Sequence, residues 1–425
     1  MRKKWIGTQI VLNNIPNSYL NKNDYFKKKL SIAKEALDLD ALLIWVDINK
    51  KDLDLIREIC TEFKIKTYLW YPILADTLGF KIEQEQAVET FDGLHGYGEN
   101  GRWDKLGKGS VCMRTCTGRE ENFLFLCPND EQNIRQIFSH YQDKIIESDF
   151  DGVFLDRIRF PSPSNGFEAL FSCFCKSCLN KFYSDYGEDL ESYRNQVKAF
   201  FKKFKTIDIN YLQDCQSFSD IIIRDNLKKF YDFRKQSVYR IVKMFADEAR
   251  QMGKLVGIDL FAPSLAPLVS QDYQLLARTC DWIKPMIYGH TSSPAGFPLE
   301  LYCLLRAILD INPALNEGQL IDEVNRLLGV NLPTQLDDLL KNGISENIIS
   351  REMQKVKEFN LPEKVDIYVG LEAVQIPGVC HIDKSILKKY LESVIEEDIK
   401  GILLSWNLWK IPDENLKLVG DFLLK

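Results

Sequence analysis

Asp151-Gly-Val-Phe-Leu-Asp156-Arg-Ile-Arg159-Phe-Pro161 is the most informative stretch of this sequence. A short apolar run ends at Asp156, and Pro161 then interrupts regular structure. Such a run is typical of a buried strand in a parallel sheet, where the last residue lies at the carboxyl end of the strand. Barrels of alternating strands and helices build their sites at that end. Asp156 is therefore a candidate catalytic residue, and Arg159 could pair with it or hold a polar substrate.

Similar apolar runs recur along the chain, each followed by a charged segment with the apolar spacing of a helix. This alternation predicts βαβ units and a parallel sheet, and eight strands are the number that closes a (β/α)8 TIM barrel. The predicted strands are Ile6–Leu12, Leu42–Asp47, Thr67–Leu74, Gly152–Asp156, Leu255–Leu260, Trp282–Tyr288, Asp366–Leu371 and Gly401–Trp406. The predicted helices include Tyr25–Leu37, Ile134–Ile146, Asn226–Gln251 and Lys384–Glu397.

Three long excursions interrupt this alternation, after predicted strands three, four and six. They cover Gly79–Glu121, Ser162–Asp225 and Gly289–Lys364. All three would emerge at the carboxyl ends of the strands, where barrels place binding and catalytic loops. We expect a single barrel domain over residues 1–425, with a cysteine-containing insertion at about 162–225 and a helical insertion at about 289–364.

Composition limits the class of protein. The net charge is −6, so no basic excess indicates nucleic acid as a partner. No apolar run approaches the roughly 20 residues that span a bilayer. The segment Trp5–Leu12 is short for a signal-peptide core and contains Thr8 and Gln9. We therefore expect a soluble cytoplasmic protein without a membrane partner; a homo-oligomer is possible.

Cysteine is abundant, with eleven in the chain. In a cytoplasmic protein, clustered cysteines indicate metal binding more than disulfides. The loop Cys173-Phe-Cys175-Lys-Ser-Cys178 offers three thiols, and Cys127 is the preferred fourth ligand, with Cys116 and Cys112 as runners-up. Four thiolates close the tetrahedral site that zinc prefers, and such a closed site is structural. The alternatives are reduced cysteines without a metal and an iron–sulfur cluster.

Two further acids lie near the carboxyl ends of predicted strands, Asp259 in the fifth and Glu372 in the seventh. With Asp156 they would meet at one rim of the barrel. Glycoside hydrolysis needs two carboxyl groups on either side of one bond, one to protonate the leaving oxygen and one to attack the sugar or activate water. In a purely structural interpretation, Asp156 pairs with a neighbouring arginine and Asp259 ties down a loop. The aromatic residues that could stack on sugar faces are Trp45, Trp70, Tyr288 and Trp406.

Cys127-Pro-Asn-Asp130, followed by the Cys-x-Cys-x-x-Cys loop, resembles the zinc-cysteine cluster of bacterial β-galactosidases of glycoside hydrolase family forty-two. In that family, a Cys-Pro-Asn segment supplies one zinc ligand and the loop supplies three. The resemblance therefore implies a structural zinc ion at Cys127, Cys173, Cys175 and Cys178. The family also has a nucleophilic glutamate at the end of strand seven, which Glu372 matches, so Asp156 would be the acid/base.

Strand four departs from this pattern, because the galactosidases end it in Asn-Glu and this chain ends it in Leu155-Asp156-Arg157. The strand is more similar to the Leu-Asp-x-x-Arg-Phe-Pro strand of uncharacterised glycosidase-like barrel families. In other sugar-cleaving barrels an aspartate at this position is itself the nucleophile. Asp259, or an acid from the strand-six loop, would then donate the proton. Both assignments stay open.

The sequence thus predicts a glycosidase that acts on a carbohydrate and carries a structural zinc ion. A non-catalytic carbohydrate-binding barrel is the main alternative, since a fold does not prove chemistry. A third interpretation is a different barrel enzyme, such as a metal-dependent hydrolase or a lyase. It would need a second, open metal site, which the four scattered histidines do little to support.

Overall fold

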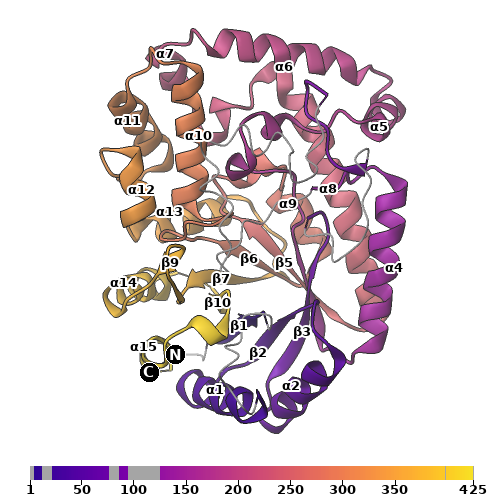
Figure 1. The fold of residues 1–425 in the computed structure, drawn as a ribbon, viewed down its shortest axis with the longest axis vertical. Helices are drawn as coiled ribbons and strands as arrows, with labels where there is room; N and C mark the ends of the chain where they lie inside the picture. The colour runs from indigo at the N-terminus through magenta and orange to yellow at the C-terminus, as the bar shows by residue number, and fades with distance from the viewer. Residues whose placement is uncertain (1–3, 12–21, 76–85, 94–124, 398, 425) are drawn as a thin grey trace.

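The computed structural model describes residues 4–11, 22–75, 86–93, 125–397 and 399–424. Eight parallel strands close into a barrel in the order β1-β10-β7-β6-β5-β4-β3-β2, which confirms the predicted (β/α)8 TIM barrel (Figure 1). The barrel strands are β1 (Trp5–Ile10), β2 (Ala41–Trp45), β3 (Lys66–Pro72), β4 (Gly152–Asp156), β5 (Leu255–Phe261), β6 (Trp282–Met286), β7 (Asp366–Glu372) and β10 (Gly401–Ser405). A small antiparallel pair, β8 (Gln375–Ile376) and β9 (Cys380–His381), follows β7.

Helices connect the strands and cover the barrel. The long helices at the right of Figure 1, α4 and α8, lie side by side, and the ring of Tyr141 on α4 lies 4.8 Å from the ring of Phe245 on α8. The N-terminus of α4 is capped by the Asp130 side chain, which accepts a hydrogen bond from the Asn133 amide. The helices are α1 (Lys22–Leu37), α2 (Lys50–Glu62), α4 (Glu131–Glu147), α5 (Lys176–Tyr186), α6 (Leu190–Phe204), α7 (Ile209–Gln213), α8 (Asp225–Gln251), α9 (Tyr273–Leu276), α10 (Phe297–Ile311), α11 (Glu317–Leu328), α12 (Leu336–Asn342), α13 (Asn347–Glu358), α14 (Lys384–Ile395) and α15 (Asp413–Leu423).

Large aromatic side chains fill the interior of the barrel. The rings of Phe154 and Trp282 stack at 5.2 Å, and those of Trp5 and Tyr368 at 4.2 Å. A glycine makes room for one of them, because a Cβ atom added at Gly257 would lie 2.1 Å from the Trp282 ring. These rings form a packed core towards the amino ends of the strands. A site can therefore form only on the side of this layer that faces the carboxyl ends of the strands.

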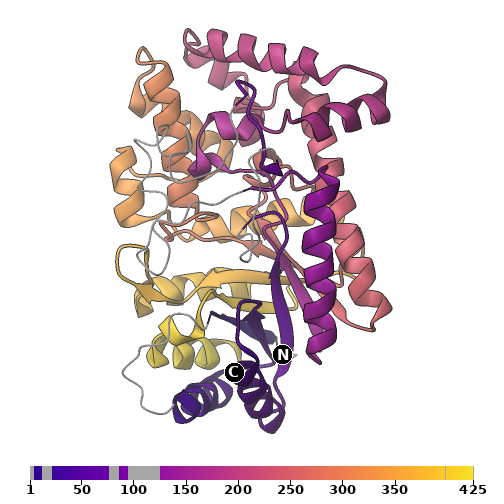
Figure 2. The ribbon, with the colours of Figure 1, turned by 45° about the vertical axis from the view of Figure 1, so that its right-hand side comes forward.

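The segments after β4 and β6 gather on one side of the barrel. Helices α5, α6 and α7 follow β4 and lie at the top of Figures 1 and 2, with α10 and α11 beside them. The excursion predicted at Gly79–Glu121 lies outside the described residues, except for 86–93. Short bridges, Ala75 with Phe125 and Ala87 with Leu126, join the described flanks of this excursion.

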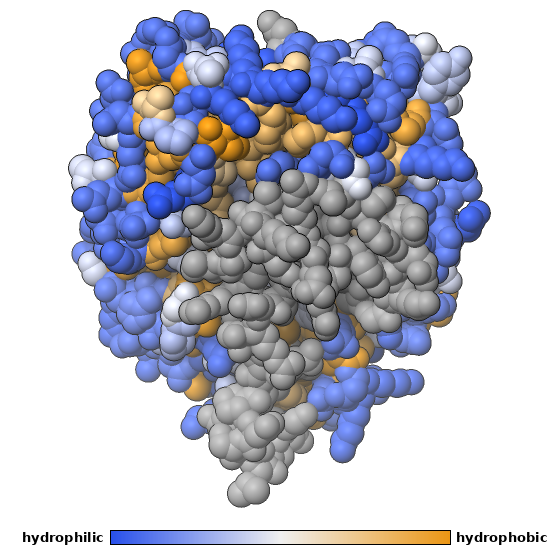
Figure 3. Space-filling view, turned by 45° about the horizontal axis from the view of Figure 1, so that its top comes forward, coloured by the Kyte–Doolittle hydropathy of each residue, from blue (hydrophilic) through white to orange (hydrophobic). Residues whose placement is uncertain are grey.

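Hydrophilic residues dominate the described part of the face in Figure 3, and hydrophobic residues gather in patches towards its upper edge. None of the helices in the described ranges combines the length and the apolar character needed to cross a membrane.

Candidate functional site

Two predicted acids occupy neighbouring positions on adjacent strands. Leu155 on β4 pairs with Ile258 on β5, so Asp156 and Asp259 are the next residues along two adjacent strands. Asp156 ends β4, and Asp259 lies two residues before the end of β5. Both side chains are buried. Burial is the main cause of the raised pKa of Asp259, and the negative charge of Asp156 adds to the rise, so the two carboxyl groups interact electrostatically.

Asp156 is surrounded by hydrogen-bond donors that suit a carboxylate. The indole Nε1 of Trp70 donates to its Oδ2 at 2.9 Å, and the backbone amide of Arg157 donates to its Oδ1 at 2.5 Å. The Arg157 Nε lies 4.0 Å from Oδ2, so Arg157 occupies the place that the sequence assigned to Arg159. Trp45 meets Trp70 edge to face with ring centres 4.8 Å apart, which fixes the indole that holds the acid.

The side chain of Asp259 is more deeply buried than that of Asp156. Its Oδ2 accepts a hydrogen bond from the Lys284 Nζ at 3.0 Å, whereas its Oδ1 is buried without a hydrogen-bond partner among the described residues. Burial raises the pKa of the Asp259 carboxyl to about 7, although the Lys284 charge opposes this rise. A carboxyl group with such a pKa exchanges its proton near neutral pH.

A chain of buried polar groups continues from Asp259 across the barrel. Lys284 also donates to Gln9 Oε1 at 3.3 Å, Ser405 Oγ donates to the same oxygen at 3.1 Å, and the Tyr288 hydroxyl donates to Ser405 at 2.6 Å. Lys284, Gln9 and Ser405 were not predicted from the sequence as members of this chain of polar groups. The available signal was a lone charged residue inside the apolar run of β6, where only a buried acid could compensate it.

The predicted sugar-stacking residues differ in exposure. Trp70 and Tyr288 are buried, and their polar atoms bind Asp156 and Ser405. Trp45 and Trp406 are half-buried. The Trp406 ring lies 6.5 Å from that of Tyr288, so the structure brings these two aromatic residues together at the carboxyl ends of the strands.

Arg159 contacts aromatic rings in the protein interior. Its side chain is buried, and its guanidinium lies over the rings of Phe125 and Phe261, with the charge centre 4.9 and 4.6 Å from the ring centres. Burial raises the pKa of the Glu300 carboxyl group, and the positive charge of Arg159 opposes this rise. Arg159 therefore contacts Phe125, Phe261 and the Phe160 carbonyl rather than Asp156, and its contact with a polar substrate stays a prediction.

Glu372 ends β7 as predicted, but hydrogen-bond donors surround its carboxylate. Oε2 accepts from the Gly289 amide at 2.9 Å and from the Tyr390 hydroxyl at 3.0 Å, and Oε1 accepts from the His290 amide at 3.0 Å. The Thr291 hydroxyl donates to Oε1 as well. Burial raises the pKa of Glu372 to about 7. This geometry ties the segment after β6 to α14 and does not support the nucleophile role that the resemblance implies.

Glu372→Gln is expected to lower the free energy of unfolding by about 1–3 kcal/mol, the cost of leaving a buried donor unpaired. The reason is that the glutamine NH2 group would face N–H and O–H donors that now bind oxygen. Urea denaturation at neutral pH measures the change. Glu147→Gln, at an exposed position of α4, is the control and should stay within about 0.5 kcal/mol of the unsubstituted protein. Equal stabilities for the two variants would contradict a structural role for Glu372.

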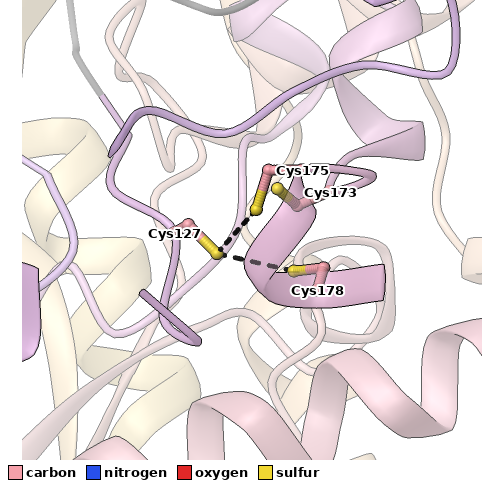
Figure 4. Close-up of side chains that lie close together, drawn as sticks. All are labelled: Cys127, Cys173, Cys175 and Cys178. Carbon is pink, nitrogen blue, oxygen red and sulfur yellow. Dashed lines mark hydrogen bonds between the residues drawn. The ribbon is translucent and has the colours of Figure 1, made fainter. Parts of the chain in front are cut away.

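The four predicted cysteine ligands converge in one buried cluster (Figure 4). Their sulfur atoms all lie within 4.8 Å of one another, and the Cys127 sulfur is 3.4 Å from those of both Cys175 and Cys178. Four sulfurs in this arrangement fit a single metal ion. The runners-up Cys112 and Cys116 lie outside the described residues.

Hydrogen-bond donors point at three of these sulfurs. The Glu89 amide donates to Cys173 at 3.3 Å, and Asn129 donates to Cys127 through its backbone at 3.4 Å and to Cys178 through its side chain at 3.3 Å. Such donors stabilise thiolates more than thiols. The cluster therefore joins the segment around Glu89 and the residues before α4 to the loop before α5 and the first turn of α5.

Comparisons with known proteins support the fold. No protein-family model matches the chain, and no curated protein matches it. Among solved structures, the glycoside hydrolase domain of PgaB (BpsB) from Bordetella bronchiseptica is similar, with a TM-score of 0.55, 13% identity and coverage of 99% of each chain. A class V chitinase from Pseudomonas fluorescens gives a TM-score of 0.48 at 9% identity, covering 99% of this chain and 100% of that chain. The likeness to the PgaB domain shows the barrel fold, and the resemblance to family forty-two galactosidases stays a prediction.

Proposed function

We propose that this protein is a glycoside hydrolase that uses Asp156 and Asp259 on a carbohydrate substrate. The proposal is supported by the register of β4 against β5, which pairs Leu155 with Ile258 and makes the buried acids Asp156 and Asp259 the next residues along the two strands. This is the end of a barrel at which sites form, and paired carboxyl groups are the machinery of sugar hydrolysis. The PgaB domain, named a glycoside hydrolase, shares the fold and is consistent with this function.

The two acids differ in environment, and this difference supports separate roles. Asp156 accepts hydrogen bonds from Trp70 and Arg157, as an ionised nucleophile would. Burial raises the pKa of Asp259 to about 7, so this group can carry a proton to the leaving oxygen. In this scheme Asp156 attacks the anomeric carbon as Asp259 protonates the departing oxygen. Water, deprotonated by Asp259, then cleaves the glycosyl ester and releases the sugar.

This assignment selects one of the alternatives that the sequence left open. Glu372 accepts hydrogen bonds from Gly289, His290, Thr291 and Tyr390, which favours a structural role for it between the segment after β6 and α14. Adjacent strands lie about 4.8 Å apart, which favours the short carboxyl separation of about 5–5.5 Å found in retaining enzymes. We therefore propose retention of anomeric configuration, which NMR of the first-formed product would test.

We further propose that the cysteine cluster holds a structural zinc ion. Four cysteine ligands leave no open coordination position, so the ion would take no part in the reaction. When bound, it would join the loop before α5 to the chain around Cys127. Zinc is the expected metal because a compact tetrahedral set of thiolates suits it well.

A screen of aryl glycosides at several pH values tests the proposed activity. The full-length protein should release the aryl group from at least one glycoside, and Asp156→Asn and Asp259→Asn should not. The rival function is a carbohydrate-binding barrel without catalysis. Sugar binding that survives in both variants, with no turnover of any glycoside by the unsubstituted protein, would support the rival.

The pH dependence of kcat/KM should report the Asp259 proton. Because Asp259 acts while protonated, activity should fall as pH rises through about 7. Lys284 favours the ionised form of Asp259, so Lys284→Met should raise this pKa and move the alkaline limb to higher pH. Steady-state rates from pH 5 to pH 9 measure the shift. An alkaline limb that is unchanged in Lys284→Met would contradict the assignment of Asp259.

A further inference from the structure

Arg234, on α8, carries a positive charge in the protein interior. Its side chain is fully buried, and its guanidinium lies over the rings of Phe160 and Tyr231, with the charge centre 4.4 and 4.6 Å from the ring centres. One nitrogen donates to the Leu170 carbonyl, while Nε and the second terminal nitrogen have no hydrogen-bond partner among the described residues. Arginine does not lose its proton in proteins, so this charge is permanent.

No aspartate or glutamate in the described ranges forms an ion pair with Arg234. Burial lowers the pKa of Arg234, and the groups that oppose this effect are Tyr231 and the cysteines Cys173 and Cys178. Buried arginines are almost always paired, because an uncompensated interior charge costs several kcal/mol. Tyr231 is itself buried, which raises the pKa of its hydroxyl and keeps it neutral. Among the described residues, Cys173 and Cys178 are thus the groups whose ionisation would compensate the Arg234 charge.

Contacts along α8 place Arg234 beside the cluster. Ser237, three residues further along the helix, accepts a hydrogen bond at 3.0 Å from the same Asn129 side chain that donates to Cys178. Phe230 lies one turn before Arg234, and its ring stacks on that of Phe174 with ring centres 4.9 Å apart. Phe174 is the residue between Cys173 and Cys175. Phe230 and Ser237 lie on the same face of α8 as Arg234. One contacts the cysteine loop, and the other contacts Asn129, two residues after Cys127.

We propose that Arg234 is the buried counter-charge of a metal centre formed by four ionised cysteines. A divalent ion bound by four thiolates keeps an excess of two negative charges, which is costly to bury. The guanidinium offsets part of this excess, and the thiolates in turn compensate the guanidinium. Neutral thiols or a pair of disulfides would offer Arg234 no negative charge from this cluster, whereas metal-bound cysteines would.

This inference rests on the metal centre proposed above and adds a residue that binds no metal itself. The test compares Arg234→Met with Arg234→Lys in the full-length protein loaded with zinc alone. Release of zinc to a colorimetric chelator should be about tenfold or more faster from Arg234→Met, in the range found for groups that support metal ligands. Arg234→Lys keeps the charge and should release zinc more slowly than Arg234→Met.

Arg159→Met is the matched control, because it also removes a buried guanidinium that lies over two aromatic rings but whose charge faces Glu300. It should release zinc at the rate of the unsubstituted protein. If Arg234→Met does not fold, Arg234→Gln is used as the uncharged variant, because glutamine keeps hydrogen-bonding capacity. Its rate of zinc release is then compared with that of Arg234→Lys. Equal release from the charged and uncharged variants, or equal acceleration in Arg159→Met, would overturn the role of Arg234. An unsubstituted protein that never binds zinc would instead refute the metal centre itself.

Discussion

Asp156→Asn is expected to lower kcat by at least about 1,000-fold on any glycoside that the protein cleaves, as is typical when a covalent nucleophile is removed. The asparagine oxygen can still accept the hydrogen bond from Trp70, so the fold should survive. The amide cannot form the glycosyl ester, so the reaction loses its covalent step. Steady-state kinetics on an aryl glycoside, with unfolding followed in parallel, separate loss of chemistry from loss of structure.

Asp149→Asn is the control, since that side chain is 88% exposed and far from the carboxyl ends of the strands; its kcat should not change. Azide added to Asp156→Ala also distinguishes the two possible roles of Asp156. If Asp156 is the nucleophile, azide attacks directly and the glycosyl azide has inverted configuration. A glycosyl azide of retained configuration would make Asp156 the acid/base, and full activity in Asp156→Asn would refute the proposed site.

Cys175→Ser should produce the second large effect, loss of the metal together with a marked loss of stability. A ligand present at 1,000 times its Kd stabilises the folded state by about 4 kcal/mol, and a thiolate-bound ion should reach at least that value. Metal analysis of the purified protein and urea denaturation with and without zinc measure the two effects. Prolonged treatment of the unsubstituted protein with a chelator should reproduce them.

Cys60→Ser provides the matched control, because Cys60 on α2 is also buried but lies outside the cluster. It should keep one zinc ion per chain, and zinc should stabilise it as much as it stabilises the unsubstituted protein. A Cys175→Ser variant that retains a full zinc ion would contradict the ligand assignment. Limited proteolysis should show new cleavage around α5 and α6 in the metal-free form, since the cluster anchors the start of this segment.

Local patterns predicted much of this structure. The eight strands followed from apolar runs, with ends that differ by a few residues, as for Ile6–Leu12 against β1. The cysteine cluster followed from the short spacing of Cys173, Cys175 and Cys178, although Cys178 lies in the first turn of α5 and not in the loop before it. The strand-end positions of Asp156 and Glu372 were also correct, because alternation along the chain fixes where a strand stops.

Contacts between distant segments could not be predicted in this way. The sequence places Glu372 at a strand end, but its donors come from Gly289 and from Tyr390, which belong to other elements. The ion pair of Lys284 with Asp259 depends on the register of β5 against β6, in which these two residues are direct partners. One sequence does not reveal a register, so the partner that tunes Asp259 became visible only in the folded barrel.

The contact between Gly257 and Trp282 has a consequence for natural variation. An added Cβ at position 257 would collide with the indole, whose ring atoms lie 2.1 Å away. A small residue at position 282 alone would leave a void in the middle of the barrel, at a cost of several kcal/mol. Homologous chains should therefore change these two positions together, and such co-variation would identify relatives that keep this interior at identities too low for ordinary alignment.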